Sequence, residues 1–230
     1  MAKKKYYLVL DTETASNASL VYDIGYTLVD RKGNVVKQAN FIVKDFFDHP
    51  FLTGLLERDL YSRKKYRTFY KQHIDTHQEM VQSFKTIRAH IRRVIDKYNA
   101  IVVAYNASFD VDALTKMSND YGMKTFFKGN TEIWDLWNVA LSVLVNSRNY
   151  QKFCLENNFV SEKGNLRTSA EVVYRYISKD VEFEEAHTAL ADTEIEAAIL
   201  NACLKRHKKF NTEYVTHIFK HPVWVARCRG

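Results

Sequence analysis

The chain has 230 residues, of which 46% are apolar and 27% charged, and its 34 basic against 27 acidic side chains give a net charge of +7. That length suits one large domain, or at most two small ones, with a sizeable core. The 7 glycines and 2 prolines exclude collagen-like, linker-rich and low-complexity chains. No apolar run approaches the roughly 18 residues of a membrane span. The basic balance suggests a polyanionic partner such as nucleic acid, although solubility alone would also explain it.

The three cysteines, Cys154, Cys203 and Cys228, are widely spaced and form no CxxC pair. A zinc cage and a disulfide framework are therefore not expected, and free thiols in a reducing compartment fit better. The first residues, Met-Ala-Lys-Lys-Lys, are basic, but the apolar run Tyr6–Leu10 that follows is too short for a signal peptide. We therefore expect a cytoplasmic protein that does not enter a membrane.

Three strands are expected near the start of the chain. Tyr6–Leu10, Leu20–Val29 and Val35–Val43 are apolar runs rich in residues that favour strands. The turn Arg31–Asn34, which contains Gly33, joins the last two. We therefore predict an antiparallel three-strand meander.

The rest of the chain alternates strands with helices. Residues 44–80 form an insert, and an amphipathic helix is expected from Met80 to Asn99. Further strands are expected at 100–104 and 132–135, and further helices at 106–121, 136–145, 148–160, 168–178 and 185–204. The pattern predicts an α/β domain over residues 1–204 with a mixed five-stranded sheet and flanking helices. The remainder, 205–230, is a basic extension expected to pack on the same domain.

Asp11 and Glu13 directly follow the first predicted strand. Because side chains alternate along a strand, these two carboxylates project from the same face. Adjacent acids repel one another and an uncompensated buried charge is costly, so bound divalent cations are the usual remedy. For this short motif alone, a strand end that runs into a solvated turn is the more common alternative.

Two further groups of polar residues repeat this placement. Asp110 follows the strand at 100–104, where it could equally decorate the N-terminus of a helix. Asp192 lies among alanines that allow its helix to approach a sheet closely. His187 and Asp192 are about 140° apart around a helix. For both to serve one site, His187 must therefore lie on the preceding loop or in the first turn.

Taken together and in this order, the three groups resemble the three motifs of the DEDDh (DnaQ-like) 3′–5′ exonucleases. The similarity covers roughly residues 6–204 and extends to Leu8-Val-Leu-Asp-Thr-Glu-Thr14, Asp23-Ile-Gly25, Tyr105-Asn-Ala-Ser-Phe-Asp110 and His187-Thr-Ala-Leu-Ala-Asp192. Compact single-domain members encoded by bacteriophages are the most similar in the last motif region. The resemblance implies a ribonuclease H-like fold and hydrolysis of nucleic acid from the 3′ end to 5′-mononucleotides.

The same resemblance implies a centre with two Mg²⁺ or Mn²⁺ ions, for which an all-carboxylate ligand set is suitable. By motif position, Asp11 would bridge both ions. Glu13 and Asp192 would complete the site of the ion that activates water, and Asp110 would hold the second ion. His187 would be the general base. Three acids near the motifs match no ligand position of the family: Asp23, Asp112 and Asp135.

The substrate is expected to meet both the motifs and the insert. Thr12 and Thr14 would line the 3′-terminal nucleotide, and Asn106 and Phe109 would contact the substrate, although core packing is an equal alternative for Phe109. Residues 61–73 interleave aromatic rings with five cations and contain no acid. That pattern suits single-stranded nucleic acid, with an exposed amphipathic helix as the alternative. The insert residues expected to bind substrate are Arg63, Lys64, Lys65, Tyr66 and Arg67.

Single-stranded DNA is slightly favoured over RNA as the substrate, and a polymerase or another replication or repair protein is an additional expected partner. Two other classes stay open. One is a catalytically silent nuclease-fold module that binds nucleic acid or a polymerase, and the other is a protein whose basic tail and aromatic residues serve a protein partner. The intact acidic motifs favour the enzyme, since a silent module has no chemical reason to keep a dense cluster of charge.

Overall fold

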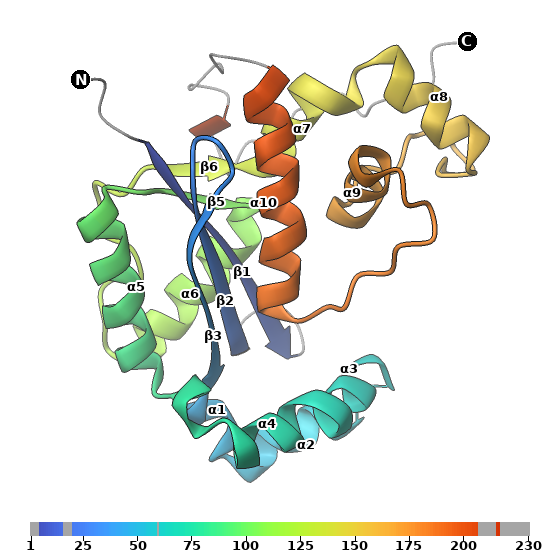
Figure 1. The fold of residues 1–230 in the computed structure, drawn as a ribbon. Helices are drawn as coiled ribbons and strands as arrows, with labels where there is room; N and C mark the ends of the chain where they lie inside the picture. Colours follow the sequence, from blue (N-terminus) through green and yellow to red (C-terminus); the bar gives the residue numbers. More distant parts are fainter. Residues whose placement is uncertain (1–4, 16–19, 59, 207–214, 217–230) are drawn as a thin grey trace.

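The computed structural model describes residues 5–15, 20–58, 60–206 and 215–216, which build a mixed sheet covered by helices (Figure 1). The six strands pair in the order β4-β3-β2-β1-β5-β6. Their bounds are Tyr6–Ala15 (β1), Leu20–Asp30 (β2), Val35–Val43 (β3), Val81–Gln82 (β4), Ile101–Ala104 (β5) and Ile133–Asp135 (β6).

The pairing confirms the predicted α/β class and the antiparallel meander. β1 pairs with β2 and β2 with β3 in antiparallel fashion, whereas β5 is parallel to β1 and β6 is parallel to β5. The predicted five strands are thus present, and β4 is a sixth. The predicted helix Met80–Asn99 included Val81, but Val81 pairs in parallel with Ile42 of β3. The helix starts only after Ser83, whose side chain accepts a hydrogen bond from the backbone nitrogen of Thr86.

Helices cover both faces of the sheet because the pleat of β1 sends alternate side chains into two cores. Leu8 and Leu10 pack with α5 and α6, whereas Tyr7 and Val9 pack with α7, α9 and α10. Figure 1 shows α5 and α6 apart from α9 and α10, with the sheet between the two groups. The bounds of these helices are Phe84–Tyr98 (α5), Ala107–Asp120 (α6), Leu136–Ala140 (α7), Arg148–Glu156 (α8), Ala170–Ser178 (α9) and Ala189–Arg206 (α10).

The predicted insert is helical and lies across one end of the sheet. It comprises α1 (Lys44–Phe47), α2 (Pro50–Arg58), α3 (Leu60–Lys65), the π-helix η1 (Tyr66–Tyr70) and α4 (Lys71–Thr76). Three of its apolar side chains are buried in the core that also holds α5 and α6: Phe46, Leu56 and Tyr70. Figure 1 shows the insert at the end of the sheet where β1 finishes and α10 begins.

Two boundary differences change the surroundings of predicted site residues. β1 continues to Ala15 because β2 pairs with it along the whole motif, with Asp11 opposite Gly25 and Glu13 opposite Asp23. The acids therefore lie within a strand and not beyond its end. The last helix starts at Ala189, so His187 lies on the loop before it.

Most of the predicted C-terminal extension lies outside the described residues, as does Cys228. Of residues 205–230, the structure describes Lys205 and Arg206 at the end of α10, together with Val215 and Thr216. Val215 is buried in the core that contains α10. The division of the chain at residue 204 and the packing of the whole extension stay predictions. No helix in the described part of the chain has both the length and the apolar character needed to cross a membrane.

Candidate active site

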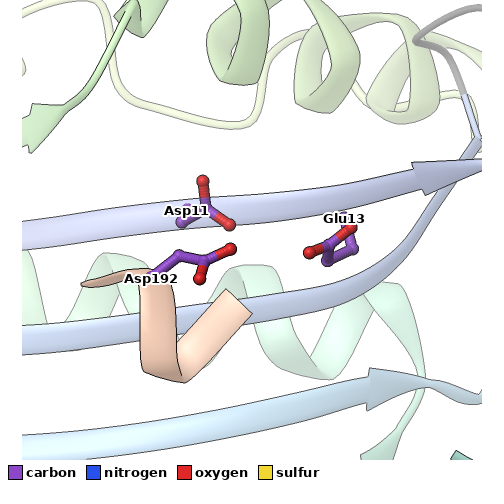
Figure 2. A group of neighbouring side chains, drawn as sticks. All are labelled: Asp11, Glu13 and Asp192. Carbon is purple, nitrogen blue, oxygen red and sulfur yellow. The ribbon is translucent and has the colours of Figure 1, made fainter. Parts of the chain in front are cut away.

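Three of the predicted metal-ligating carboxylates come together at one point (Figure 2). Asp11 and Glu13 lie on β1 two residues apart, so they share the face of the strand that packs against α10. Asp192 lies in the first turn of α10. One carboxylate oxygen from each residue lies within 4.8 Å of those of the other two. A strand near the start of the domain and a helix near its end therefore build one acidic cluster.

The cluster depends on a close approach between β2 and the start of α10. Gly25 of β2 pairs with Asp11 of β1. A Cβ atom on Gly25 would lie 2.3 Å from the backbone carbonyl carbon of Ala189, a distance at which the atoms overlap. Only glycine at this position therefore allows the first turn of α10 to lie on the strand and to carry Asp192 to Asp11.

Asp23, two residues before Gly25, connects three parts of the fold. Its carboxylate is buried, and Oδ2 accepts hydrogen bonds from the Tyr70 hydroxyl at 2.8 Å and from the backbone nitrogen of Ala189 at 3.2 Å. Burial raises the pKa of Asp23 to about 7, and both hydrogen bonds oppose that shift. The side chain thereby ties the insert and the start of α10 to the sheet.

Asp110 lies next to the acidic cluster but is not one of the three residues within 4.8 Å. It is buried in the first turn of α6, and its Oδ1 accepts a hydrogen bond from the hydroxyl of Thr12 at 2.8 Å. Burial raises the pKa of Asp110 to about 7, against the effect of that hydrogen bond. Because Asp110 also contributes to the raised pKa of Asp11, the two carboxyl groups are electrostatic neighbours.

The cluster carries more negative charge than the surrounding protein neutralises. Burial first, and then the neighbouring acids, raise the pKa of Asp11 well above its ordinary value and that of Asp192 to about 8. Asp192 is 8% exposed, and its Oδ1 has no hydrogen-bond partner among the described residues. An all-oxygen donor set with an unpartnered buried oxygen fits a hard divalent cation such as Mg²⁺ or Mn²⁺.

One cation from the insert reaches this cluster. The Nζ atom of Lys65 lies 3.1 Å from Oε2 of Glu13 and donates a hydrogen bond to the backbone oxygen of His187 at 2.7 Å. The Tyr22 hydroxyl donates to the same oxygen of Glu13 at 3.3 Å. Burial raises the pKa of Glu13, and Lys65 opposes the shift. The sequence placed Lys65 among the substrate-binding residues, and the structure places its ammonium on a candidate metal ligand.

His187 lies on the loop before α10. This is one of the two positions that its spacing from Asp192 allows if both residues serve one site. Its backbone has a φ of 52°, in the left-handed region. The Nδ1 atom lies 3.6 Å from Oε2 of Glu185, and the side chain is 42% exposed. Burial and the charge of Lys65 lower the pKa of His187. A lowered pKa keeps the imidazole neutral near pH 7, the state in which it can accept a proton.

The other predicted substrate residues differ in their surroundings. Phe109 is 40% exposed, so it does not belong to the core. Asn106 is exposed, and its Oδ1 accepts a hydrogen bond from the Ser108 hydroxyl. The ring of Tyr66 stacks on that of Phe47. Thr14 and Arg63 are half-buried, and Lys64 and Arg67 are exposed. The contacts of all these residues with a substrate stay predictions.

Two acids near the cluster were missed by the sequence analysis. Burial and the charge of Glu171 raise the pKa of Glu185 to about 7. Glu196 is 3% exposed, and burial followed by the charges of Asp110 and Asp192 raises its pKa well above the ordinary value. Helical periodicity could have found Glu196, because it follows Asp192 by four residues on α10. Glu185 lies on a loop, where no sequence pattern indicates its neighbours.

No protein-family model matches the chain, and a comparison with curated proteins gives no significant match. Among solved structures, the chain is similar to Exonuclease X in complex with 5′-overhanging duplex DNA, with a TM-score of 0.54 and 17% identity over 93% of this chain and 99% of that one. It is also similar to E. coli Exonuclease I in complex with a dA16 oligonucleotide, with a TM-score of 0.58 and 16% identity over 89% of this chain and 42% of that one. At these identities the likeness establishes the fold, which is the ribonuclease H-like fold of these exonucleases.

Proposed function

We propose that this protein is a metal-dependent 3′–5′ exonuclease that hydrolyses single-stranded nucleic acid to 5′-mononucleotides. The observation that carries the proposal is the convergence of Asp11, Glu13 and Asp192 from distant segments, with Asp110 beside them. Such a concentration of buried acid costs stability, so a catalytic or metal-binding purpose explains it better than packing does. The fold, which is shared with solved exonucleases, supports the same reading.

The carboxylates would hold two divalent cations. Asp11, Glu13 and Asp192 would bind the first, and Asp11 and Asp110 would bind the second. When bound, such ions lower the pKa of a water nucleophile and stabilise the leaving 3′ oxygen. The chain itself supplies the geometry, because β1 and the first turn of α10 fix the relative positions of the ligands. The buried hydrogen bond from Thr12 orients the carboxylate of Asp110.

His187 would accept the proton of the attacking water. Its lowered pKa makes the neutral, proton-accepting form the dominant one near pH 7. Because Nδ1 is the atom near Glu185, the N–H of the neutral imidazole would lie on Nδ1, and Nε2 would accept the proton of the water. The carboxylate of Glu185 then stabilises the imidazolium that forms, as an acid beside a catalytic histidine does in general.

Single-stranded DNA is the substrate we favour, with RNA as the alternative. The insert, which Figure 1 shows at the end of the sheet where β1 finishes and α10 begins, carries Arg63, Lys64, Lys65 and Arg67. Cations interleaved with aromatic rings suit a single strand. A polymerase or another replication or repair protein would be an additional partner, and one similar solved structure is an ExoI/SSB-Ct complex.

A cytoplasmic location and kinship with bacteriophage enzymes complete the proposal. The described cysteines, Cys154 and Cys203, are buried and are not joined in a disulfide, which suits a reducing compartment. The relation to bacteriophage enzymes comes only from the resemblance of the last motif.

The proposal is tested by incubating the purified protein with 3′- and 5′-labelled single strands of DNA and RNA in Mg²⁺, Mn²⁺ or chelator. We expect metal-dependent ladders from 5′-labelled strands and labelled mononucleotide from 3′-labelled strands. Asp11→Asn should abolish hydrolysis, and His187→Ala should slow it by about 10²–10⁴-fold. Asp120→Asn, a change of an exposed carboxylate at the end of α6, is the matched control and should retain full activity. Hydrolysis by Asp11→Asn at the wild-type rate would refute the assignment.

The same assay separates the other two classes of function. Strands that are shifted in a gel but not cut would identify a silent nucleic-acid-binding module. Strands that are neither bound nor cut would point to a protein partner.

A further inference from the structure

Lys65 makes an unusual pair of contacts for a residue of a basic surface helix. It is the last residue of α3, and its ammonium bridges Glu13 Oε2 at 3.1 Å and the backbone oxygen of His187 at 2.7 Å. The side chains of Lys65 and Glu13 are only 14% and 16% exposed, so water screens the pair weakly. The insert, β1 and the loop before α10 thus meet at one charged atom.

The surrounding contacts anchor the segment that carries this ammonium. Directly after Lys65, the chain enters η1, where the ring of Tyr66 stacks on Phe47 with an interplanar angle of 8°. At the end of η1, the buried Tyr70 donates its hydroxyl hydrogen bond to Asp23. Lys65 is therefore attached to an anchored segment, so its ammonium stays within side-chain reach of the acidic cluster.

A lysine and a divalent cation on the same carboxylate compete. Glu13 is one of the three residues whose oxygens lie within 4.8 Å of one another, and it already forms an ion pair with Lys65. A doubly charged ion placed a few ångströms from a fixed ammonium is strongly repelled where water screens poorly. The geometry therefore favours either the ion or the ammonium on Glu13.

We propose that Lys65 is a tethered counter-cation of the acidic cluster, which a divalent ion displaces from Glu13 and which then binds a phosphate of the nucleic-acid substrate. The inference rests on the proposed function and adds to it a coupling between metal binding and substrate binding. The displaced ammonium needs another anion. Residues 61–73 contain no acid, and Glu185, whose pKa Lys65 acts to lower, is a neighbour of Asp192 and therefore of the same ion. A phosphodiester that enters beside Arg63 and Lys64 supplies that anion.

The first test measures metal binding without any turnover. Mn²⁺ affinity is determined by calorimetry for the wild type, Lys65→Met and Lys64→Met. Methionine keeps the length and apolar stem of lysine, and Lys64 is an exposed neighbour on the same helix. We expect Lys65→Met to bind Mn²⁺ about tenfold more tightly than the wild type, and Lys64→Met to bind it as the wild type does. Equal or weaker binding by a folded Lys65→Met variant would overturn the inference.

The second test measures substrate binding with and without metal. Fluorescence anisotropy follows a labelled single-stranded DNA in the His187→Ala background, where hydrolysis is slow. With Mn²⁺, Lys65→Met should weaken binding about tenfold and reduce the salt dependence by about one phosphate contact. In chelator, Lys65→Met should have little effect. Lys64→Met should weaken binding equally in both conditions, and an equal loss for Lys65→Met would contradict the coupling.

The failure of this inference can be told from the failure of the proposed function. If the wild type binds no Mn²⁺ and cuts no strand, the exonuclease proposal fails and the role of Lys65 fails with it. If the wild type binds Mn²⁺ and cuts from the 3′ end, but Lys65→Met binds Mn²⁺ no more tightly, only the counter-cation role is wrong. Thermal unfolding of each variant establishes that it is folded before either measurement is interpreted.

Discussion

Replacing Asp192 with asparagine should stabilise the metal-free protein while abolishing its activity. The Asp192 side chain is buried, and Glu185 and Glu13 both disfavour its ionised form. Together with burial, these charges raise the pKa of Asp192 from 3.8 to about 8, and only Lys65 among the main contributors opposes the shift. A carboxyl group whose pKa is higher in the folded chain than in the unfolded chain favours folding at low pH. That contribution is lost as the pH rises from about 4 to about 8.

The shift sets the size of the effect. At about 1.36 kcal/mol for each pKa unit, a change from 3.8 to about 8 corresponds to about 5 kcal/mol of destabilisation at pH 8. Neighbouring carboxyl groups take up protons when Asp192 loses its own, which relieves part of the repulsion. We therefore expect Asp192→Asn to raise the free energy of unfolding by about 3 kcal/mol at pH 8 in chelator, and by about 1 kcal/mol at pH 5.

Urea denaturation at pH 5 and pH 8 in chelator measures both values, with Asp120→Asn as the control for loss of an exposed carboxylate. Adding Mn²⁺ should stabilise the wild type, by about 2.7 kcal/mol at a concentration 100 times the Kd, and should stabilise Asp192→Asn far less. An Asp192→Asn protein that is no more stable than the wild type at pH 8 would show that the cluster carries no uncompensated charge. The cluster would then have no electrostatic need for a bound cation.

Two further predictions concern the same region. Mn²⁺ affinity should rise steeply between pH 6 and pH 8. Burial raises the pKa of Asp110 to about 7 and that of Asp192 to about 8, and both carboxyl groups must lose their protons to bind an ion. Calorimetry in buffers of different ionisation enthalpy should detect the proton release, and a Mn²⁺ affinity that is constant over this range would contradict the prediction. Gly25→Ala should lower the free energy of unfolding by at least about 2 kcal/mol and abolish Mn²⁺ binding, because its Cβ would lie 2.3 Å from the Ala189 backbone. Gly129→Ala, which has open space around the added atom, is the matched control, and a Gly25→Ala protein as stable as this control would disprove the close approach.

The long strands could be predicted from the sequence because their signals are local. β1, β2 and β3 are dense runs of apolar and β-branched residues, and the turn between β2 and β3 contains Gly33, whose φ of 84° favours glycine. β4 could not be predicted in this way. It is two residues long, and it is a strand only because the insert returns the chain to β3, where Val81 meets Ile42. The amphipathic pattern that runs into Val81 from α5 outweighed any local strand signal.

The acidic cluster was predictable in its members but not in its surroundings. Asp11 and Glu13 share a face by the strand period, and the order of the motifs pointed to Asp192. Neither signal reveals that Lys65, some 50 residues further along the chain, donates to Glu13. The sequence indicated that residues 61–73 are basic, but a basic composition does not specify which acid a given lysine contacts. The contact itself depends on how the insert packs through Tyr70 and Asp23, and no local pattern encodes that packing.

The pleat of β1 explains why one short segment can organise the whole site. Asp11 and Glu13 continue the row of Tyr7 and Val9 and face α10, whereas Thr12 continues the row of Leu8 and Leu10 and donates to Asp110 of α6. Each row is anchored by its own buried core, so the strand cannot slip by one residue without exchanging both sets of side chains. The repulsion among the carboxylates is therefore held against rigid elements on both sides of the sheet. Carboxylates that repel one another but are held together by two buried cores are what a site built to bind cations requires.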